Sequence, residues 1–282
     1  MFRLWAENEE GEKLELTNSP DYDVTDIDGL LPTKAVINKT NLTNLDGSIL
    51  NSTRIESREI TVTIKPRGNV EENRQKLYDF FRVKKETVLH FKNGTRDLKI
   101  VGIVESFGGS LFTQTQTIDV SLLCLNPYFE DEKKTAEIMA TVEDLFEFPF
   151  AIEKTGIEFS RVNKEMVKVI CNKGDTETGV LIELEATGEV INPIIYNVDT
   201  REFFGLKIEM QLGDVIRINT NSLNKKVELI RYGETRNIIN TILRGNKWFR
   251  IATGKSTFTY QCEGGEENLN VKFTYSNMYE GV

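Results

Sequence analysis

Apolar and polar residues alternate along much of the chain. The pattern is clear at Ile60, Val62 and Ile64, which are separated by Thr61 and Thr63. It recurs in four further segments: 118–124, 167–171, 180–184 and 269–275. A period of two places the apolar side chains on one face of a strand. Glycine-containing turn signals such as Asp46-Gly47, Asn93-Gly94 and Gly264-Gly265 separate such segments. We therefore expect a mainly β protein whose strands each bury one face.

One segment follows a helical period instead. Asn69 is a suitable N-cap residue, and Glu72 follows it three positions later. Leu77 and Phe81 then recur four residues apart, which places them on the same side of a helix. The spacing predicts one α-helix over about 70–83, packed through these two side chains on a sheet in the first half of the chain.

The strand pattern is interrupted near the middle of the chain. Pro127 and Pro149 enclose a run in which residues 130–147 hold seven acidic side chains. Proline disfavours the interior of regular structure, so this run is the expected domain boundary. Short alternating segments follow Pro149 at spacings near ten residues, which favours a β-sandwich or jelly roll. We expect an N-terminal domain, an acidic linker and a C-terminal sandwich, at 1–128, 129–149 and 150–278 respectively.

Composition and charge disfavour several classes of protein. The chain has 282 residues, of which 39% are hydrophobic and 28% charged. That composition is globular and provides enough core without disulfides or metals. The formal net charge is −9 and no basic stripe is present, so we expect no sequence-specific nucleic-acid binding. No apolar run reaches 18 residues, and charge begins at Arg3, so we expect neither membrane insertion nor a secretory signal.

Few residues offer candidate catalytic chemistry. The single histidine, His90, lies in a segment that is typical of a strand, and we expect it to be an ordinary hydrogen-bonded strand residue. The three cysteines, Cys124, Cys171 and Cys262, are far apart and form no metal-binding motif, so we expect reduced core residues. We therefore predict no catalytic residue, no metal ligand and no cofactor.

Two further groups of residues have alternative interpretations. Four aspartates cluster between Asp21 and Asp28, but an EF-hand loop that begins at Asp21 would place Asp26 where glycine is needed and Pro32 where glutamate is needed. A solvated turn is the simpler interpretation. Trp248 and Phe249 are the best candidates for stacking on a sugar ligand, although such a tryptophan more often belongs to the core.

Short motifs along nearly the whole chain resemble those of a known family, the distal tail proteins of siphophages. In the first half they are Phe2-Arg3-Leu4, Leu14-Glu15-Leu16, Tyr22-Asp23-Val24, Ile27-Asp28-Gly29-Leu30, Asp46-Gly47-Ser48, Arg58-Glu59-Ile60-Thr61-Val62 and Cys124-Leu125-Asn126-Pro127-Tyr128-Phe129. In the second half they are Asn172-Lys173-Gly174-Asp175, Val180-Leu181-Ile182-Glu183, Gly188, Asn192-Pro193, Gly213-Asp214, Ile218-Asn219-Thr220 and Tyr279-Glu280-Gly281-Val282. Their common order and spacing, rather than any single motif, indicate the relationship.

The resemblance implies a structural role and a set of partners. It implies a ring-forming N-terminal β domain with one helix, which residues 279–282 rejoin, and a galectin-like C-terminal sandwich. In the family, six copies form a ring that caps the tail tube and joins it to the host-recognition apparatus. The implied partners are further copies of the chain, the tail tube protein, a tail-associated lysin or tail spike, and a receptor-binding protein. The implied location is the virion tail tip, after synthesis in the host bacterial cytoplasm.

Two other functions compete with this assembly role. The C-terminal sandwich would serve as a carbohydrate- or receptor-binding module if it docked a cell-wall saccharide or a receptor-binding protein. A hydrolase of cell-wall polymer is the weaker alternative, because the chain has a single histidine and no metal-binding motif.

A candidate for the ring contact lies in residues 38–57. This stretch is too polar for a pair of core strands, yet it contains isolated apolar residues. A hairpin turning at Asp46-Gly47 would project from the sheet and lay these residues on a neighbouring copy; a mobile surface loop is the alternative. The candidate interface residues are Leu42, Leu45, Asp46, Gly47, Ile49 and Leu50.

Overall fold

The chain divides into two compact units, each with its own hydrophobic core. The computed structural model describes residues 2–43, 46–139, 141–144, 160–163 and 167–282. Unit 1 comprises Met1–Glu132 and Met278–Val282, and unit 2 comprises Lys133–Asn277. The chain therefore leaves unit 1 after Glu132 and returns to it at Met278.

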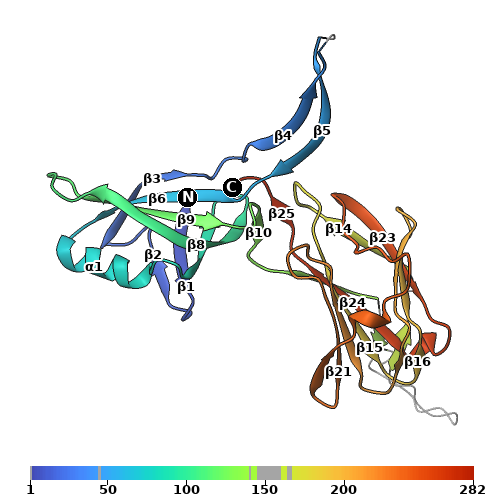
Figure 1. Ribbon diagram of the computed structural model, residues 1–282. Helices are drawn as coiled ribbons and strands as arrows, with labels where there is room; N and C mark the ends of the chain where they lie inside the picture. Colours follow the sequence, from blue (N-terminus) through green and yellow to red (C-terminus); the bar gives the residue numbers. More distant parts are fainter. Residues whose placement is uncertain (1, 44–45, 140, 145–159, 164–166) are drawn as a thin grey trace. The chain divides into compact units, whose positions relative to one another are not determined.

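An antiparallel sheet of nine strands forms the body of unit 1 (Figure 1). Its main path runs in the order β2-β1-β7-β8-β9-β6-β3, while β10 pairs with both β8 and β25. The strands are β1 (Arg3–Asn8), β2 (Lys13–Glu15), β3 (Tyr22–Asp28), β6 (Arg58–Pro66), β7 (Glu86–Lys92), β8 (Asp97–Ser110), β9 (Thr117–Cys124), β10 (Phe129–Asp131) and β25 (Met278–Tyr279). The last of these strands, β25, overlaps residues 279–282, which the family resemblance implied would rejoin the first domain.

One face of this sheet is buried beneath helix α1 (Val70–Phe80). Ile60, Val62 and Ile64 on β6 have almost no exposed surface, so the predicted inward face of this strand is confirmed. Leu77 and Phe81 belong to the same buried cluster, as the helical spacing predicted. Burial of these side chains stabilises the unit. Removing one such large apolar side chain from water contributes roughly 1.5–3 kcal/mol to the free energy of folding.

The ends of the helix differ from the prediction. The helix stops at Phe80, and the Phe81 N–H closes it by donating to the Leu77 carbonyl. Lys84 then adopts a positive φ of 72°, which redirects the chain toward β7. At the other end the Asn69 side chain does not cap the helix; its Nδ2 donates to the Glu72 carboxylate at 3.0 Å.

Two antiparallel sheets form most of unit 2. The six-stranded sheet has the order β11-β24-β15-β20-β21-β22, and the four-stranded sheet has the order β14-β23-β17-β18. The first comprises β11 (Thr135–Ile138), β15 (Leu181–Ala186), β20 (Val215–Asn219), β21 (Lys226–Arg231), β22 (Glu234–Asn237) and β24 (Leu269–Tyr275). The second comprises β14 (Val167–Asn172), β17 (Ile194–Asn197), β18 (Glu202–Gly205) and β23 (Gly254–Gln261). Further elements are the pairs β12 (Thr141–Asp144) with β13 (Ser160–Asn163) and β16 (Val190–Ile191) with β19 (Glu209–Met210), and the 3-10 turns Ile239–Thr241 and Glu266–Asn268.

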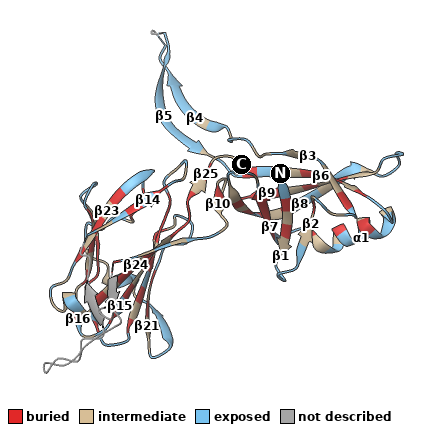
Figure 2. Cartoon of the chain, turned by 180° about the vertical axis from the view of Figure 1, so that it is seen from behind, coloured by how far each residue is buried: buried red, intermediate tan, exposed pale blue. Residues whose placement is uncertain are grey.

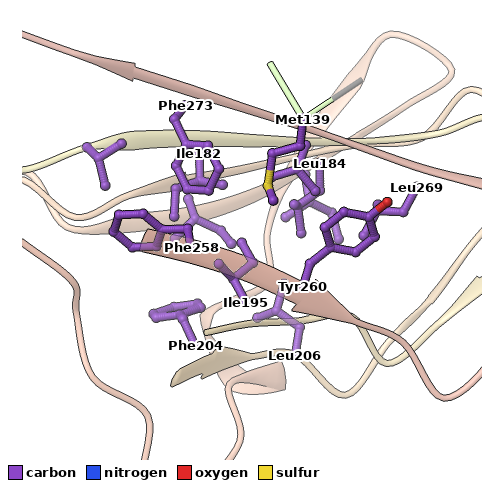
Figure 3. Packing of buried hydrophobic residues seen from close by; sticks show 14 of the residues in the cluster. Met139, Ile182, Leu184, Ile195, Phe204, Leu206, Phe258, Tyr260, Leu269 and Phe273 are labelled. Atoms are coloured by element: carbon purple, nitrogen blue, oxygen red, sulfur yellow. The ribbon is translucent and has the colours of Figure 1, made fainter. Parts of the chain in front are cut away.

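The apolar faces of these two sheets pack against each other. Figure 3 shows Ile182 and Phe273 from the larger sheet above Phe258, Ile195 and Phe204 from the smaller one. All five side chains are buried. This sheet-on-sheet packing makes unit 2 a β-sandwich, in agreement with the expected fold class of a mainly β protein with one helix.

The alternating segment at 167–171 presents its apolar residues to solvent, contrary to the prediction. Val167 and Val169 on β14 are 56% and 51% exposed, and Cys171 is exposed as well. The opposite face of the strand is buried and includes Asn172, whose Nδ2 donates to the carbonyls of Thr176 and Ile251. Because hydrogen bonds satisfy a polar residue in the interior, the period of the pattern did not reveal which face was inward.

The expectation that all three cysteines are core residues is therefore wrong. Cys124 is fully buried, and burial raises the pKa of its thiol to about 12. Cys171 is exposed and Cys262 is partly buried. Cys171 lies on a strand face that the sandwich does not cover, whereas Cys262 packs against the core of unit 2 without being fully buried.

The acidic segment predicted as a linker at 129–149 contains regular structure where it is described. β10 joins the sheet of unit 1, and β11 pairs with β24 in unit 2. The boundary between the units therefore falls within this segment, between Glu132 and Lys133. Residues 145–149 lie outside the described residues. Strand pairing outweighed the acidic composition; β11 lies at the edge of its sheet, where charged side chains can stay in solvent.

The aspartates between Asp21 and Asp28 lie largely on a strand rather than in a turn. Asp23 accepts a hydrogen bond from Arg67 at 2.6 Å, whereas Asp26 and Asp28 accept from the following backbone N–H groups. Strand β3 is an edge strand, so its carboxylates stay in contact with solvent. Of the helices in the described residues, none is both long and apolar enough to span a membrane.

Candidate assembly site

A two-stranded hairpin extends from unit 1 between β3 and β6 (Figure 1). We call it the arm; it consists of β4 (Ala35–Asn41), β5 (Ser48–Ile55) and the turn between them. The two strands pair with each other alone and form a separate antiparallel sheet. None of the residues described in these two strands is buried, and Figure 2 shows the arm mostly in the colour of exposed residues.

The two faces of the arm differ in polarity. Cross-strand neighbours share a face, so the pairing of Asn38 with Ser52 defines one side. On that side Asn38 Nδ2 donates to Ser52 Oγ at 2.9 Å, and Asn51 Nδ2 donates to Thr40 Oγ1 at 2.8 Å. These hydrogen bonds give the side a polar surface along much of its length.

The opposite face carries more of the apolar side chains, because only Val36 and Ile49 lie on the first side. Ile37 is paired with Thr53, and Leu50 is paired with Lys39 after a bulge in β5. Ile37 and Leu50 are 59% and 61% exposed. We call this side, which also includes Ala35 and Ile55, the apolar face of the arm. An isolated two-stranded hairpin is at best marginally stable in water, so the apolar face has a strong tendency to become covered.

Most of the predicted interface residues lie on the arm, but not all on one face. Leu42, Asp46 and Gly47 lie at its tip, where Gly47 adopts a positive φ of 99°. Leu50 lies on the apolar face, whereas Ile49 is paired with Thr40 and faces the opposite side. Leu45 lies outside the described residues. Ile37, which lies just before the predicted stretch 38–57, shares the face of Leu50.

A single buried arginine holds both ends of the arm against the sheet. Arg58 is the first residue of β6, where the chain returns from the arm, and it is almost completely buried. Its Nη1 donates to the carbonyls of Gly29 and Leu31, at 2.6 and 2.9 Å, where the chain departs toward the arm. Its Nε donates to the Pro127 carbonyl at 2.7 Å, and its guanidinium lies 4.6 Å from the centre of the Phe129 ring.

The same arginine contacts the last residues of the chain. Arg58 Nη2 lies 2.5 Å from the Glu280 carbonyl oxygen. Burial lowers the pKa of Arg58, and no carboxylate is among its hydrogen-bond acceptors in the described structure. Its charge is therefore stabilised by carbonyl dipoles and by an aromatic face. The sequence alone offered little sign of this role, because Arg58 precedes an ordinary alternating strand.

The structure separates the two predicted stacking residues. Phe249 is fully buried in the core of unit 2, so it has no free face for a ligand. Trp248 is partly buried, meets Phe204 edge-on at 5.0 Å, and has Lys225 Nζ 5.6 Å from its ring centre. Their adjacent positions on an extended segment direct the two side chains to different sides. The pair cannot form a stacking platform, and a ligand contact of Trp248 alone stays a prediction.

His90 is a buried strand residue, as the sequence indicated. It lies in β7, stacks on Trp5 with 5.0 Å between ring centres, and places Nδ1 2.7 Å from a Glu132 carboxylate oxygen. The second ring nitrogen, Nε2, lies 3.7 Å from Glu7. Among the described histidine, cysteine, aspartate and glutamate residues, no group of three is arranged to hold a metal ion.

Two protein families match successive parts of the chain. Residues 9–124 match the phage tail protein RIFT-related domain, and residues 173–279 match the C-terminal domain of the siphovirus-type tail component. A comparison with curated protein sequences gives no significant match.

Solved structures share the fold over the full length of the chain. The Dit protein of phage SPP1, described as a paradigm of the hub adsorption apparatus in phages that infect Gram-positive bacteria, has a TM-score of 0.69 at 11% identity, with 99% of each chain covered. The phage P2 baseplate in its activated conformation with calcium has a TM-score of 0.56 at 12% identity, and its form with strontium has 0.55 at 12% identity; both comparisons cover 100% of each chain. At these identities the likeness shows the fold.

Proposed function

The chain belongs to the distal tail protein family of siphophages, whose members are structural hub proteins, and from this membership we propose that copies of it close into a ring at the tail tip. Six copies is the number that the family resemblance implies. Such a hub needs a rigid scaffold and complementary surfaces rather than reacting groups, so the proposed role is structural and not enzymatic.

The observation that carries the proposal is the apolar face of the arm. A closed ring uses a heterologous contact, in which one patch meets a different patch on the next copy. The arm supplies one such patch: it extends from the sheet, and Ile37 and Leu50 are more than half exposed on the same side. Packing this face on a neighbouring copy would remove these side chains from water and support a hairpin that has little stability of its own.

The remaining partners follow from the position of a hub in the tail. We propose that one side of the ring binds the tail tube protein and that the other binds a tail-associated lysin or tail spike. The β-sandwich of unit 2 is the proposed attachment point for the receptor-binding protein. Support for these partners comes from the family resemblance and from the baseplate structures that share the fold.

The arm contact is tested by polar substitutions on one face at a time. The test variant is Ile37→Ser with Leu50→Ser; the control is Val36→Ser with Ile49→Ser, which makes the same chemical change on the opposite face. Sedimentation at matched concentration should show the ring in the wild type and in the control, and its loss in the test variant at an unchanged melting temperature. A test variant that retains the full ring would contradict the arm contact. A wild-type chain that is monomeric at every concentration and salt would contradict self-assembly.

A further inference from the structure

Arg58 and the last residues of the chain meet at the base of the arm. The arm departs after Gly29 and returns at Arg58, so these two positions are its roots. Arg58 links the two roots, because its backbone begins β6 at the second root and its guanidinium donates to the carbonyls of Gly29 and Leu31 at the first. The direction of a two-stranded ribbon is set at its roots, because β4 and β5 form a ladder only with each other and none with a described strand of the sheet.

The chain end lies against the same roots. The Val282 N–H donates to the Leu30 carbonyl at 3.3 Å, and a methyl group placed on Gly281 would lie 3.2 Å from both the Leu30 carbonyl oxygen and Pro32 Cδ. Residues 279–282, which we call the strap, therefore lie across the first root of the arm. Two side chains hold it: Arg58 through the Glu280 carbonyl and Arg96, whose Nη1 donates to the Gly281 carbonyl at 2.7 Å.

Aromatic contacts and strand pairing fix the strap further. Arg96 lies 4.5 Å from the centre of the Tyr279 ring, and Tyr279 pairs with Phe129 across β25 and β10. Phe129 in turn packs beneath the Arg58 guanidinium. The two arginines, the strap and β10 thus form one continuous cluster within unit 1. Because β10 leads out to unit 2 and β25 leads back from it, both connections between the units begin at this cluster.

We propose that Arg58 is the positioning residue of the arm and that the strap locks the arm in the direction needed for the ring. The inference rests on the proposed role of the arm in assembly. A planar guanidinium is required because one side chain must donate to four carbonyls in different directions. A lysine supplies one nitrogen and cannot reproduce this fork. Loss of the strap leaves Arg58 buried with one carbonyl acceptor fewer and frees the first root.

Arg58 could instead be an ordinary stabilising residue of unit 1, and a matched control separates the two roles. The test variant is Arg58→Lys. The control is Leu77→Ala, which opens the same unit between helix and sheet and removes no hydrogen bond of the roots or the strap. A role limited to stability predicts that both variants lower the melting temperature and leave the Val282 amide, which bonds the Leu30 carbonyl, equally protected well below that temperature.

The measurement is amide hydrogen exchange of the full chain at a concentration where it is monomeric, followed by sedimentation at a concentration where the wild type forms the ring. Arg58→Lys should accelerate exchange of the Val282 amide, which donates to the Leu30 carbonyl, by at least tenfold and reduce the ring population. Leu77→Ala should leave both unchanged below its melting temperature. Unaltered exchange and full ring formation in Arg58→Lys would overturn the proposal, and so would equal effects of the two variants.

A second variant guards against failure of Arg58→Lys to fold. Gly281→Val keeps both arginines and crowds the strap away from Leu30 and Pro32. It should accelerate exchange of the Val282 amide and weaken the ring, and a variant that does neither would overturn the role of the strap. The exchange readout is taken on monomers, so it tests the positioning role even if the wild-type chain fails to assemble, an outcome that would contradict the proposed ring alone.

Discussion

The Arg231 guanidinium holds the Asp214 carboxylate through two nitrogens, with Nε at 2.8 Å and Nη2 at 2.5 Å. Asp214 is buried, and its second oxygen also accepts from the Gln211 N–H at 2.8 Å. Hydrogen bonding from Arg231 holds the pKa of Asp214 below its ordinary value. The pair connects the turn before β20 with the end of β21, so it stabilises one end of the larger sheet of unit 2.

This pair predicts an acid-sensitive step in the stability of unit 2. A carboxyl group whose pKa is lowered by folding contributes stability above its unfolded pKa and loses it as the pH falls through the folded value, here below about pH 4. Asp214→Asn should lower the stability of unit 2 at pH 7 by about 1–3 kcal/mol and reduce its acid sensitivity. The control Glu234→Gln affects the exposed pair with Arg236 and should change stability little. Thermal melts from pH 3 to 7 would contradict the role of Asp214 if both variants matched the wild type.

Val62→Asp should unfold unit 1. Val62 is 1% exposed and lies between Ile27 on β3 and Val120 on β9. An unpaired carboxylate at this position should cost several kcal/mol, which is on the order of the whole stability of a domain, about 5–15 kcal/mol. Glu59→Asp, on the exposed side of the same strand, is the control and should melt normally. A soluble Val62→Asp protein with a wild-type melting curve would mean that the β6 register is wrong.

Two glycines with positive φ should respond differently to alanine. Gly265 and Gly233 have φ values of 70° and 81°, so both substitutions carry a backbone strain of roughly 1–2 kcal/mol. At Gly265 the new methyl group would also overlap the Glu189 carbonyl, whereas at Gly233 it would meet open space. Denaturant titration should therefore show a clearly larger loss of stability for Gly265→Ala. Equal losses would show that the close approach at Gly265 relaxes without cost.

Trypsin should nick the chain between the units without separating the fragments. Lys133 and Lys134 are exposed and lie between β10 and β11, outside either ladder. After cleavage there, the C-terminal fragment still carries β25, which pairs with β10 and supplies the Glu280 carbonyl to Arg58. The two fragments should co-elute in native gel filtration and separate in denaturant. Separation under native conditions would contradict the pairing of β25 with β10.

Ring assembly should be favoured by moderate salt. Each copy carries a formal net charge of −9, so ring closure brings like charges together. Screening is effective beyond a Debye length of roughly 8–10 Å at ordinary ionic strength, while burial of the apolar face of the arm is not weakened by salt. Sedimentation across a sodium chloride series should show more ring at higher salt. A ring that dissociates as salt rises would indicate that opposite charges, rather than apolar contacts, hold the copies together.

Several parts of the fold were predictable from the sequence because they depend on local periodicity. Ile60, Val62 and Ile64 were assigned correctly because β6 is strictly alternating. The helix was found from the spacing of Leu77 and Phe81, although its end at Phe80 depends on how the chain turns toward β7. The hairpin at Asp46-Gly47 was anticipated from turn chemistry. In each case the signal lies within about ten consecutive residues.

Other parts were decided by contacts between distant segments. Val169 belongs to an alternating strand, yet only the packing of the sandwich placed Ile170 inward and left Val169 in solvent. The acidic residues after Phe129 looked like a linker because strand pairing with β8, β25 and β24 is invisible in local composition. The faces of the arm were likewise set by a bulge and a register that only pairing determines.

Arg58 and Glu280 show this division most clearly. They are 222 positions apart, and nothing near either residue in the sequence indicates that one donates a hydrogen bond to the other. The sequence alone determined which segments become strands, that one helix covers the first sheet, and that the chain resembles the distal tail proteins. The tertiary structure decided which faces are buried, where the units divide, and which carbonyls surround the buried arginine. The physical reason is that periodicity acts over a few residues, whereas the burial of a charge must be satisfied by whatever groups the completed fold brings to it.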